Sequence, residues 1–110
     1  MNLDVLNAVA PVAAIGRSLA GAKLQPADLS QAEIMEAYAV QAIACVQGAG
    51  LAEEITNLGG GALARGHPIG ASGAVNAVRL FHELRHRGGG IGIAAIAAAG
   101  GLGTAVLLGY

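Results

Sequence analysis

The 110-residue sequence predicts a small α/β domain with the element order αβαβαββ. Apolar residues recur at helical spacing in three segments, and short apolar runs bounded by glycine or proline alternate with these segments and follow them. A composition with 55% hydrophobic and 12% charged residues fits a buried sheet of this kind. We find no repeat, linker or low-complexity segment, so residues 1–110 are expected to form one domain.

The first third of the chain is expected to hold one helix and one strand. Pro11–Ala22 is predicted to be helical, because proline is tolerated in an opening turn and Gly21 lies near the end. Residues 26–29 follow as a turn. Ala32–Met35 is then predicted to be a short buried strand.

A second helix is predicted over about 36–47, and glycines at positions 48 and 50 end it. Its apolar residues at helical spacing are Ala39, Ile43 and Val46. Ile55–Leu58 is predicted to be a second short strand that leads into a glycine-dense segment.

The last third is predicted to form a longer helix and two strands. The helix covers Ala71–Arg87, with arginines that suit its C-terminus. Its apolar residues on neighbouring faces are Val75, Val78 and Phe81. Ile91–Ala98 and Thr104–Leu108 are predicted to be strands joined by a turn at 100–103, because they are rich in isoleucine, valine and alanine.

The glycine-dense segment Gly59–Gly73 carries the strongest functional signal, because it places His67 directly before the third helix. Glycines let a ligand or a second chain approach the backbone closely, and amide groups converge at the helix N-terminus. In isolation, His67 would instead be interpreted as a loop residue hydrogen-bonded to the backbone.

Three segments together carry a family resemblance. Gly59–Gly73 is similar to G-G-x-[IL]-A-x-G-H-P-x-G-x-S-G, Glu36–Gln41 is similar to N-E-A-F-A-x-Q, and Gly88–Leu108 is similar to a closing glycine-rich hairpin. These are segments of the thiolases, the acyl-CoA C-acyltransferases that include acetyl-CoA acetyltransferase and 3-ketoacyl-CoA thiolase. The chain therefore resembles the C-terminal half of a thiolase.

The resemblance implies half of a layered α/β/α/β/α assembly, with a mixed β-sheet and helices on both faces. The half that carries the nucleophilic cysteine in the family has no counterpart in this sequence. An isolated copy would expose the third helix, so the resemblance implies a partner, either an N-terminal thiolase-like half on a separate chain or another copy in a homo-oligomer.

In the family, the motif histidine pairs with the nucleophilic cysteine and helps bind the thioester oxygen as negative charge develops. The resemblance therefore implies a catalytic role for His67. It also implies a coenzyme A thioester as the substrate, with no bound cofactor and no metal. The implied substrate-binding residues are Gly66, Pro68, Tyr38 and, through its backbone amide, Ala99.

Three departures from the family pattern change the expected chemistry. Met35 stands where an asparagine positions an oxyanion-hole water, and methionine cannot donate a hydrogen bond. Ala97 stands where a second cysteine acts as acid and base in the Claisen step, and alanine carries no proton. Gly59 stands where an asparagine is common. We expect ordinary reversible Claisen condensation to be impaired.

Three further residues have structural interpretations. Glu36 is expected to stabilise the positive end of a helix dipole, and Ser72 to cap a helix or pack as a small residue. Cys45 is expected to be a small buried residue of the second helix. Because it lies within this helix, Cys45 does not replace a missing catalytic group.

The run His82–His86 matches H-E-x-x-H, the spacing that places two zinc ligands on one helical face. No third histidine follows it, and the segment ends its helix beside arginines. We therefore favour a solvated helix terminus over a zinc hydrolase.

The apolar run Gly88–Gly109 is long enough to cross a bilayer, and basic residues precede it. Its glycines weaken an isolated helix, and Gly-Gly-Leu-Gly is more typical of a hairpin turn. We predict two buried strands and no membrane span.

A net charge of −1 gives no electrostatic basis for binding nucleic acid. The single cysteine fits a reducing compartment, and Asp4 interrupts the first apolar residues, so a cytoplasmic location without a signal peptide is expected. With so few charged residues, some apolar surface is expected to contact protein.

Two functional classes follow. In the first, the chain is the C-terminal subunit of a thiolase-like acyltransferase and His67 completes a site shared with a partner. In the second, it is a non-catalytic interaction module that keeps the half-fold without the chemistry, as Met35 and Ala97 suggest.

Overall fold

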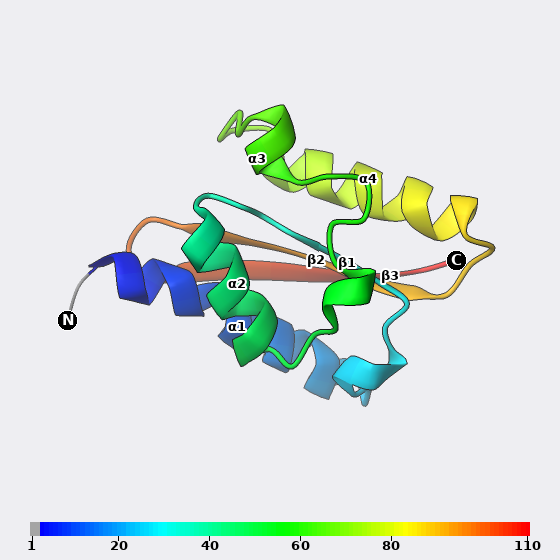
Figure 1. Cartoon of the computed structure of the whole chain (residues 1–110). Helices are drawn as coiled ribbons and strands as arrows, with labels where there is room; N and C mark the ends of the chain where they lie inside the picture. The colour runs from blue at the N-terminus through cyan, green and yellow to red at the C-terminus, as the bar shows by residue number, and fades with distance from the viewer. Residues whose placement is uncertain (1–2) are drawn as a thin grey trace.

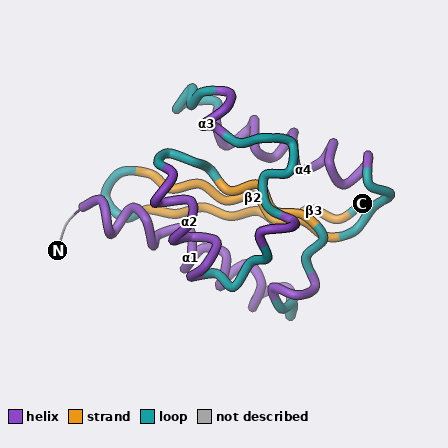
Figure 2. The backbone as a smooth tube through the Cα atoms, in the orientation of Figure 1, coloured by secondary structure: helices purple, strands orange, loops and turns teal. Residues whose placement is uncertain are grey.

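A mixed sheet lies between two helical layers (Figure 1). The computed structural model describes residues 3–110, and within them three strands pair in the order β1 (Gln31–Ile34), β2 (Ile91–Ala98) and β3 (Leu102–Gly109). β1 runs parallel to β2, and β3 runs antiparallel to it. The predicted α/β class, with helices on both faces of a mixed sheet, is confirmed (Figure 2).

One face of the sheet is covered by α1 (Leu3–Ala22) and α2 (Ala39–Gly48), which also pack against each other. The main core lies here, between these helices and the strands. Its buried members are Ile15, Leu19, Leu29, Ala32, Ile34, Cys45, Val46, Leu51, Ile93 and Ala95.

The prediction that the first helix begins at Pro11 is wrong, because α1 begins at Leu3 and Pro11 lies inside it. A proline in a helix interior removes one backbone hydrogen bond. Here Pro11 is buried where α1 approaches β3, and a side chain at Gly103 would overlap the Ala10 carbonyl oxygen. Close packing of helix on strand offsets the lost hydrogen bond.

The opposite face is covered by α4 (Ser72–His86), which packs on all three strands. Leu80 and Leu84 are fully buried against Ala94 of β2. Val78 and Phe81 are 56% and 41% exposed. α4 therefore packs on the sheet through Leu80 and Leu84, and not through Val78 and Phe81, which were noted in the sequence for their helical spacing.

The second predicted strand, Ile55–Leu58, is reduced to one parallel bridge between Ala32 and Thr56, preceded by a 3₁₀ turn at Glu53–Ile55. Asn57 ends the extended backbone because its φ is 50°. Its carboxamide takes over the pairing: Oδ1 accepts from the Ile34 amide at 2.8 Å, and Nδ2 donates to the Ile34 carbonyl at 2.9 Å.

Smaller differences concern the helices. The second helix begins at Ala39, three residues later than expected, since Tyr38 has an extended backbone. The short helix α3 (Ala62–Arg65) lies within the glycine-dense segment, where a loop was predicted. The expected turn at 26–29 is a 3₁₀ turn at Pro26–Asp28. The run 88–109 forms β2 and β3, and no helix within residues 3–110 is long and apolar enough to span a membrane.

Candidate functional site

Three segments that are distant in sequence meet beyond the carboxyl ends of β1 and β2. Parallel strands place the loops that follow them at one edge of the sheet, which is where α/β proteins bind ligands. A cavity of about 370 Å³ lies there. It is lined by Ala37, Tyr38, Gln41, His67, Ile69, Ile96, Ala97, Ala98, Ala99 and Thr104.

His67 is half-buried in the turn between α3 and α4. Its Nδ1 lies 2.5 Å from Oγ of Ser72, the first residue of α4. The Ser72 hydroxyl donates to the Pro68 carbonyl at 3.0 Å and is almost completely buried. Ser72 is thus a packed residue that contacts His67, while Ala71 occupies the N-cap position.

Gly66 and Pro68 flank His67 without lining the cavity. Gly66 ends α3 with φ of 97°, a left-handed value that glycine adopts at no steric cost, and its amide donates to Ala62 at 2.7 Å. The Pro68 carbonyl accepts from the amides of Ala71 and Ser72 at 2.8 and 2.9 Å. Both residues shape the turn that presents His67.

Tyr38 and Ala99 both line the cavity, and Tyr38 is 61% exposed, so it forms part of the wall and not of the core. Gln41 also lines the cavity, and we did not predict it as a site residue. Its Oε1 accepts from the Ala37 amide at 3.1 Å, while Nε2 donates to Cys45 Sγ at 3.2 Å. A glutamine at the third position of a helix is a recognisable capping signal that could have identified it.

Of the departures from the family pattern, Ala97 lies in the wall of the cavity and Met35 does not. Met35 is buried, its amide bonds to the Ala95 carbonyl at 3.0 Å, and it does not line the cavity. Ala97 does line it. His67 and Tyr38 are the titratable side chains among the lining residues.

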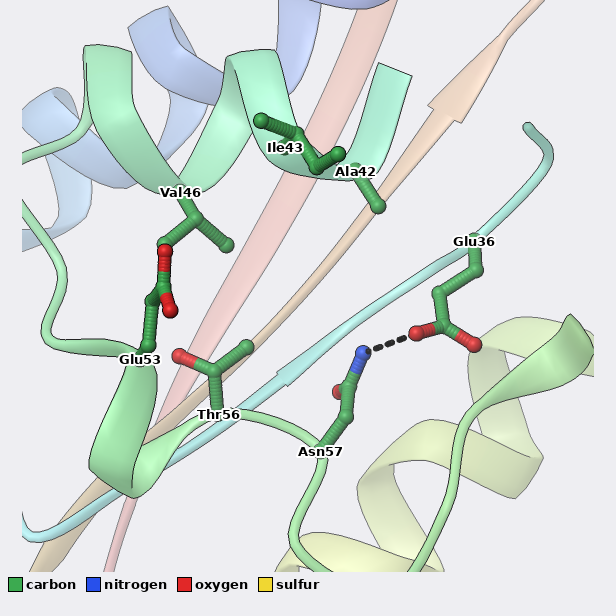
Figure 3. Close-up of a pocket in the computed structure, with 7 residues that line it drawn as sticks. All are labelled: Glu36, Ala42, Ile43, Val46, Glu53, Thr56 and Asn57. Carbon is green, nitrogen blue, oxygen red and sulfur yellow. Dashed lines mark hydrogen bonds between the residues drawn. The ribbon is translucent and has the colours of Figure 1, made fainter. Parts of the chain in front are cut away.

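Glu36 anchors the loop that leads to His67. Its carboxylate accepts from Asn57 Nδ2 at 3.1 Å (Figure 3). It also accepts from the Leu63 amide in α3 at 3.1 Å. The expectation that Glu36 lies at the start of the second helix is wrong, because α2 begins only at Ala39; Glu36 instead accepts from an amide of α3. Glu36 also borders a second cavity of about 330 Å³, between α2 and residues 53–57.

A charged pair lies beneath α4. Glu33 on β1 is 2% exposed, and its Oε1 lies 3.8 Å from Arg79 Nε, too far for a hydrogen bond. Burial raises the pKa of the Glu33 carboxyl to about 7, although the guanidinium groups of Arg79 and Arg65 act to lower it. Glu33 does not line the His67 cavity.

Cys45 is completely buried in the main core, as expected. Burial raises the pKa of its thiol, which is the opposite of what a nucleophilic cysteine requires.

His82 and His86 are exposed on α4, and Glu83 between them bonds Arg87 Nε at 3.3 Å. No group of three histidine, cysteine, aspartate or glutamate side chains within residues 3–110 is placed to hold a metal ion.

Comparisons with known proteins agree on one family. The family described as thiolase, C-terminal domain, matches residues 4–110. The acetyl-CoA acetyltransferase of Cupriavidus necator is 45% identical over 96 residues, which are 87% of this chain and 24% of that protein. The chain spans about a quarter of the length of the curated relatives it matches.

Solved structures give the same result. Human mitochondrial 3-ketoacyl-CoA thiolase in complex with CoA is similar with a TM-score of 0.92 and 37% identity, covering 98% of this chain and 27% of that one. The peroxisomal 3-ketoacyl-CoA thiolase of Saccharomyces cerevisiae has a TM-score of 0.86 and 35% identity, covering 92% of this chain and 28% of that one. That protein is a five-layered α-β-α-β-α structure built from two core domains of identical topology.

Proposed function

The chain belongs to the thiolase family, as a C-terminal domain, and from this membership we propose that it contributes His67 to an acyl-CoA site. The nucleophilic cysteine of that site lies on a partner polypeptide or on a further segment of a longer protein. The observation that carries the proposal is the cavity in which His67 meets the segments around Tyr38 and Ala99.

The proposed reaction is transfer of an acyl group from coenzyme A to the partner's cysteine. His67 accepts the proton of the thiol, the sulfur attacks the thioester carbonyl, and coenzyme A leaves as a thiolate that takes the proton back from His67. The Ala99 segment borders the same cavity, where its backbone amide can face the developing oxyanion.

The cavity lining supports acyl transfer better than carbon–carbon bond formation. Claisen condensation needs a base that removes a proton from the second acyl group, and Ala97 carries no such group. Met35 does not replace the missing hydrogen-bond donor, because a thioether has no hydrogen to donate and the side chain does not line this cavity. We propose that an acyl-enzyme forms and that condensation is strongly impaired.

Exposed apolar residues on one surface of the chain support the proposal that a partner domain binds there. Val78 and Phe81 of α4 and Val106 of β3, which pairs with Ala94 beneath α4, are exposed by 56%, 41% and 42%. Val106 also lines a cavity of about 170 Å³, together with Asn76, whose Nδ2 is buried without a hydrogen-bond partner. A second domain, as in the five-layered relative, would cover this surface and could satisfy Asn76.

The alternative function is a non-catalytic interaction module that docks through the same surface. The observation that favours it is the lining itself, where alanine stands at positions 97–99 and the polar side chains are few. Under this alternative His67 has no chemical task.

The test uses the chain together with the protein that co-purifies with it. The complex is incubated with acetyl-CoA, and intact-mass spectrometry measures the acyl group on the partner's cysteine. His67→Ala is expected to lower the rate of acyl-enzyme formation by about 100-fold or more. His86→Ala, exposed at the end of α4, is the matched control and is expected to leave the rate unchanged.

Two results would contradict the proposal. Equal acylation in His67→Ala and in the unaltered complex would favour the interaction module, provided that the partner stays bound. Robust acetoacetyl-CoA thiolysis that survives loss of His67 would overturn the proposed chemistry altogether.

A further inference from the structure

We propose that Ser72 is a positioning residue that keeps a proton on Nδ1 of His67 and so confines proton exchange to Nε2. The inference rests on the proposed function for its meaning, but its geometry and its test concern the free chain. It assigns a chemical task to Ser72, which was expected from the sequence to cap a helix or to pack as a small residue.

The number of hydrogens at this contact decides which atom donates. The Ser72 hydroxyl has one hydrogen and two neighbouring atoms that could accept it, the Pro68 carbonyl at 3.0 Å and His67 Nδ1 at 2.5 Å. If the hydroxyl donates to Pro68, then Nδ1 must carry its own proton and donate to Oγ. Both contacts are then hydrogen bonds.

If the hydroxyl hydrogen is placed toward Nδ1 instead, the hydrogen bond to the Pro68 carbonyl is lost. If Ser72 donated to Nδ1, its oxygen would face the Pro68 carbonyl oxygen at 3.0 Å with no hydrogen between them. Two acceptors at that distance repel each other. A serine hydroxyl that bonds the carbonyl four residues earlier is also a common helical arrangement, which further favours donation to Pro68.

The burial of Ser72 strengthens the preference for the Nδ1–H tautomer of His67. Ser72 is 1% exposed, so water cannot supply a bond that either tautomer leaves unmade. His67 lines the large cavity, whereas Ser72 does not. The Nδ1 edge of the ring is therefore held against α4, and the Nε2 edge is the one available to a group in the cavity.

The arrangement serves both charge states of the ring. A protonated imidazole donates from both nitrogens, so the bond from Nδ1 to Ser72 is kept when His67 gains a proton. The proton is gained and lost at Nε2, which is the requirement for a base that must exchange one proton with a thiol in the cavity.

The test reads the tautomer directly. Two-bond ¹H–¹⁵N correlation spectra of the ¹⁵N-labelled chain, recorded at about pH 8.5 where an ordinary imidazole is neutral, distinguish a protonated ring nitrogen from a bare one. We expect Nδ1 of His67 to be protonated and Nε2 to be bare. His82 and His86, which are exposed, serve as internal references for a mixed population.

Variants assign the effect to the hydroxyl. Ser72→Ala is expected to shift His67 toward the tautomer mixture of the exposed histidines, and Ser72→Thr is expected to restore the Nδ1–H form, because threonine can make the same bond to Pro68. Ser18→Ala on α1, whose Oγ bonds Ala105 at 3.4 Å, is the matched control and should leave His67 unchanged.

A wild-type spectrum with Nε2 protonated and Nδ1 bare would overturn the proposal, and so would an unchanged tautomer in a folded Ser72→Ala. The wild-type spectrum decides by itself if Ser72→Thr does not fold. Because no substrate or partner is needed, an inactive complex would contradict the proposed function and leave this result standing.

Discussion

The carboxylate of Glu36 occupies the place where a side chain at Gly61 would stand. Gly61 has an extended backbone, with φ of −101° and ψ of −164°, so another residue could adopt its conformation. The glycine is needed for space, because the carboxylate bonds Leu63 and Asn57 directly beside it. This contact ties the segment after β1 to the loop that carries His67.

Gly61→Ala is expected to destabilise the chain by about 1–3 kcal/mol, because the new methyl group displaces the carboxylate from its two hydrogen bonds. Urea unfolding measures the change. In a Glu36→Ala background the same substitution should cost far less, since nothing remains to be displaced. Gly73→Ala in α4, where a Cβ meets nothing within 4 Å, is the control and should be neutral or slightly stabilising. An equal cost in both backgrounds would rule out the Glu36 contact as the cause.

Leu80 and Val78 lie two residues apart on α4 and have opposite environments, fully buried and 56% exposed. Leu80→Ala is expected to lower the free energy of unfolding by about 2–5 kcal/mol, because it opens a cavity against the sheet. Val78→Ala should leave the unfolding of the chain nearly unchanged and weaken binding of the partner, as measured by analytical ultracentrifugation. Partner affinity that is insensitive to Val78 would place the interface on another surface.

The raised pKa of the Glu33 carboxyl predicts that the stability of the fold depends on pH. Its carboxyl has a pKa of about 7 in the folded chain against an ordinary value of 4.5. Below pH 4.5 it is neutral in both states; as the pH rises from 4.5 to 7 it ionises first in the unfolded chain, so folding loses stability across this window. At about 1.4 kcal/mol per pKa unit, the loss amounts to about 3.5 kcal/mol above pH 7.

Glu33→Gln is expected to remove this part of the pH dependence, so the variant gains stability relative to the wild type as the pH rises through the window. Urea titrations at several pH values measure the difference. Asp28→Asn, on the exposed turn before β1, is the control. Parallel stability curves for wild type and Glu33→Gln would contradict the raised pKa.

Gly103→Ala is expected to be strongly destabilising, by about 2 kcal/mol or more, because the added methyl group meets the backbone of Ala10 and Pro11, which cannot rotate away. Gly109→Ala in the same strand has open space around the new methyl group and should change stability little. Thermal unfolding compares the two. Similar melting temperatures would mean that α1 can shift on the sheet without cost.

The sequence predicted the strands and helices with strong local patterns. β2, β3 and α4 lie within a few residues of their expected bounds, because β-branched runs and glycine turns act locally. The strand at 55–58 was not found, since the pairing of Asn57 with Ile34 is a side-chain contact between segments more than twenty residues apart. The predicted start of α1 at Pro11 was wrong because the hydrogen bond that this proline removes is offset by packing on Gly103, a residue near the other end of the chain.

For the site, the sequence by itself identified His67 as the residue proposed to carry the chemistry, and it placed Met35 and Ala97 at two positions where the family has hydrogen-bonding or proton-carrying side chains. The family itself was also determined at this level, because the motifs are contiguous strings whose meaning does not depend on their distance in space. Only the tertiary structure decided which side chains meet: that Gln41 and Thr104 border the His67 cavity, that Glu36 holds α3 instead of α2, and that Ser72 contacts the His67 ring. These relationships depend on how three loops converge at one edge of the sheet, and no local pattern encodes a distance between loops.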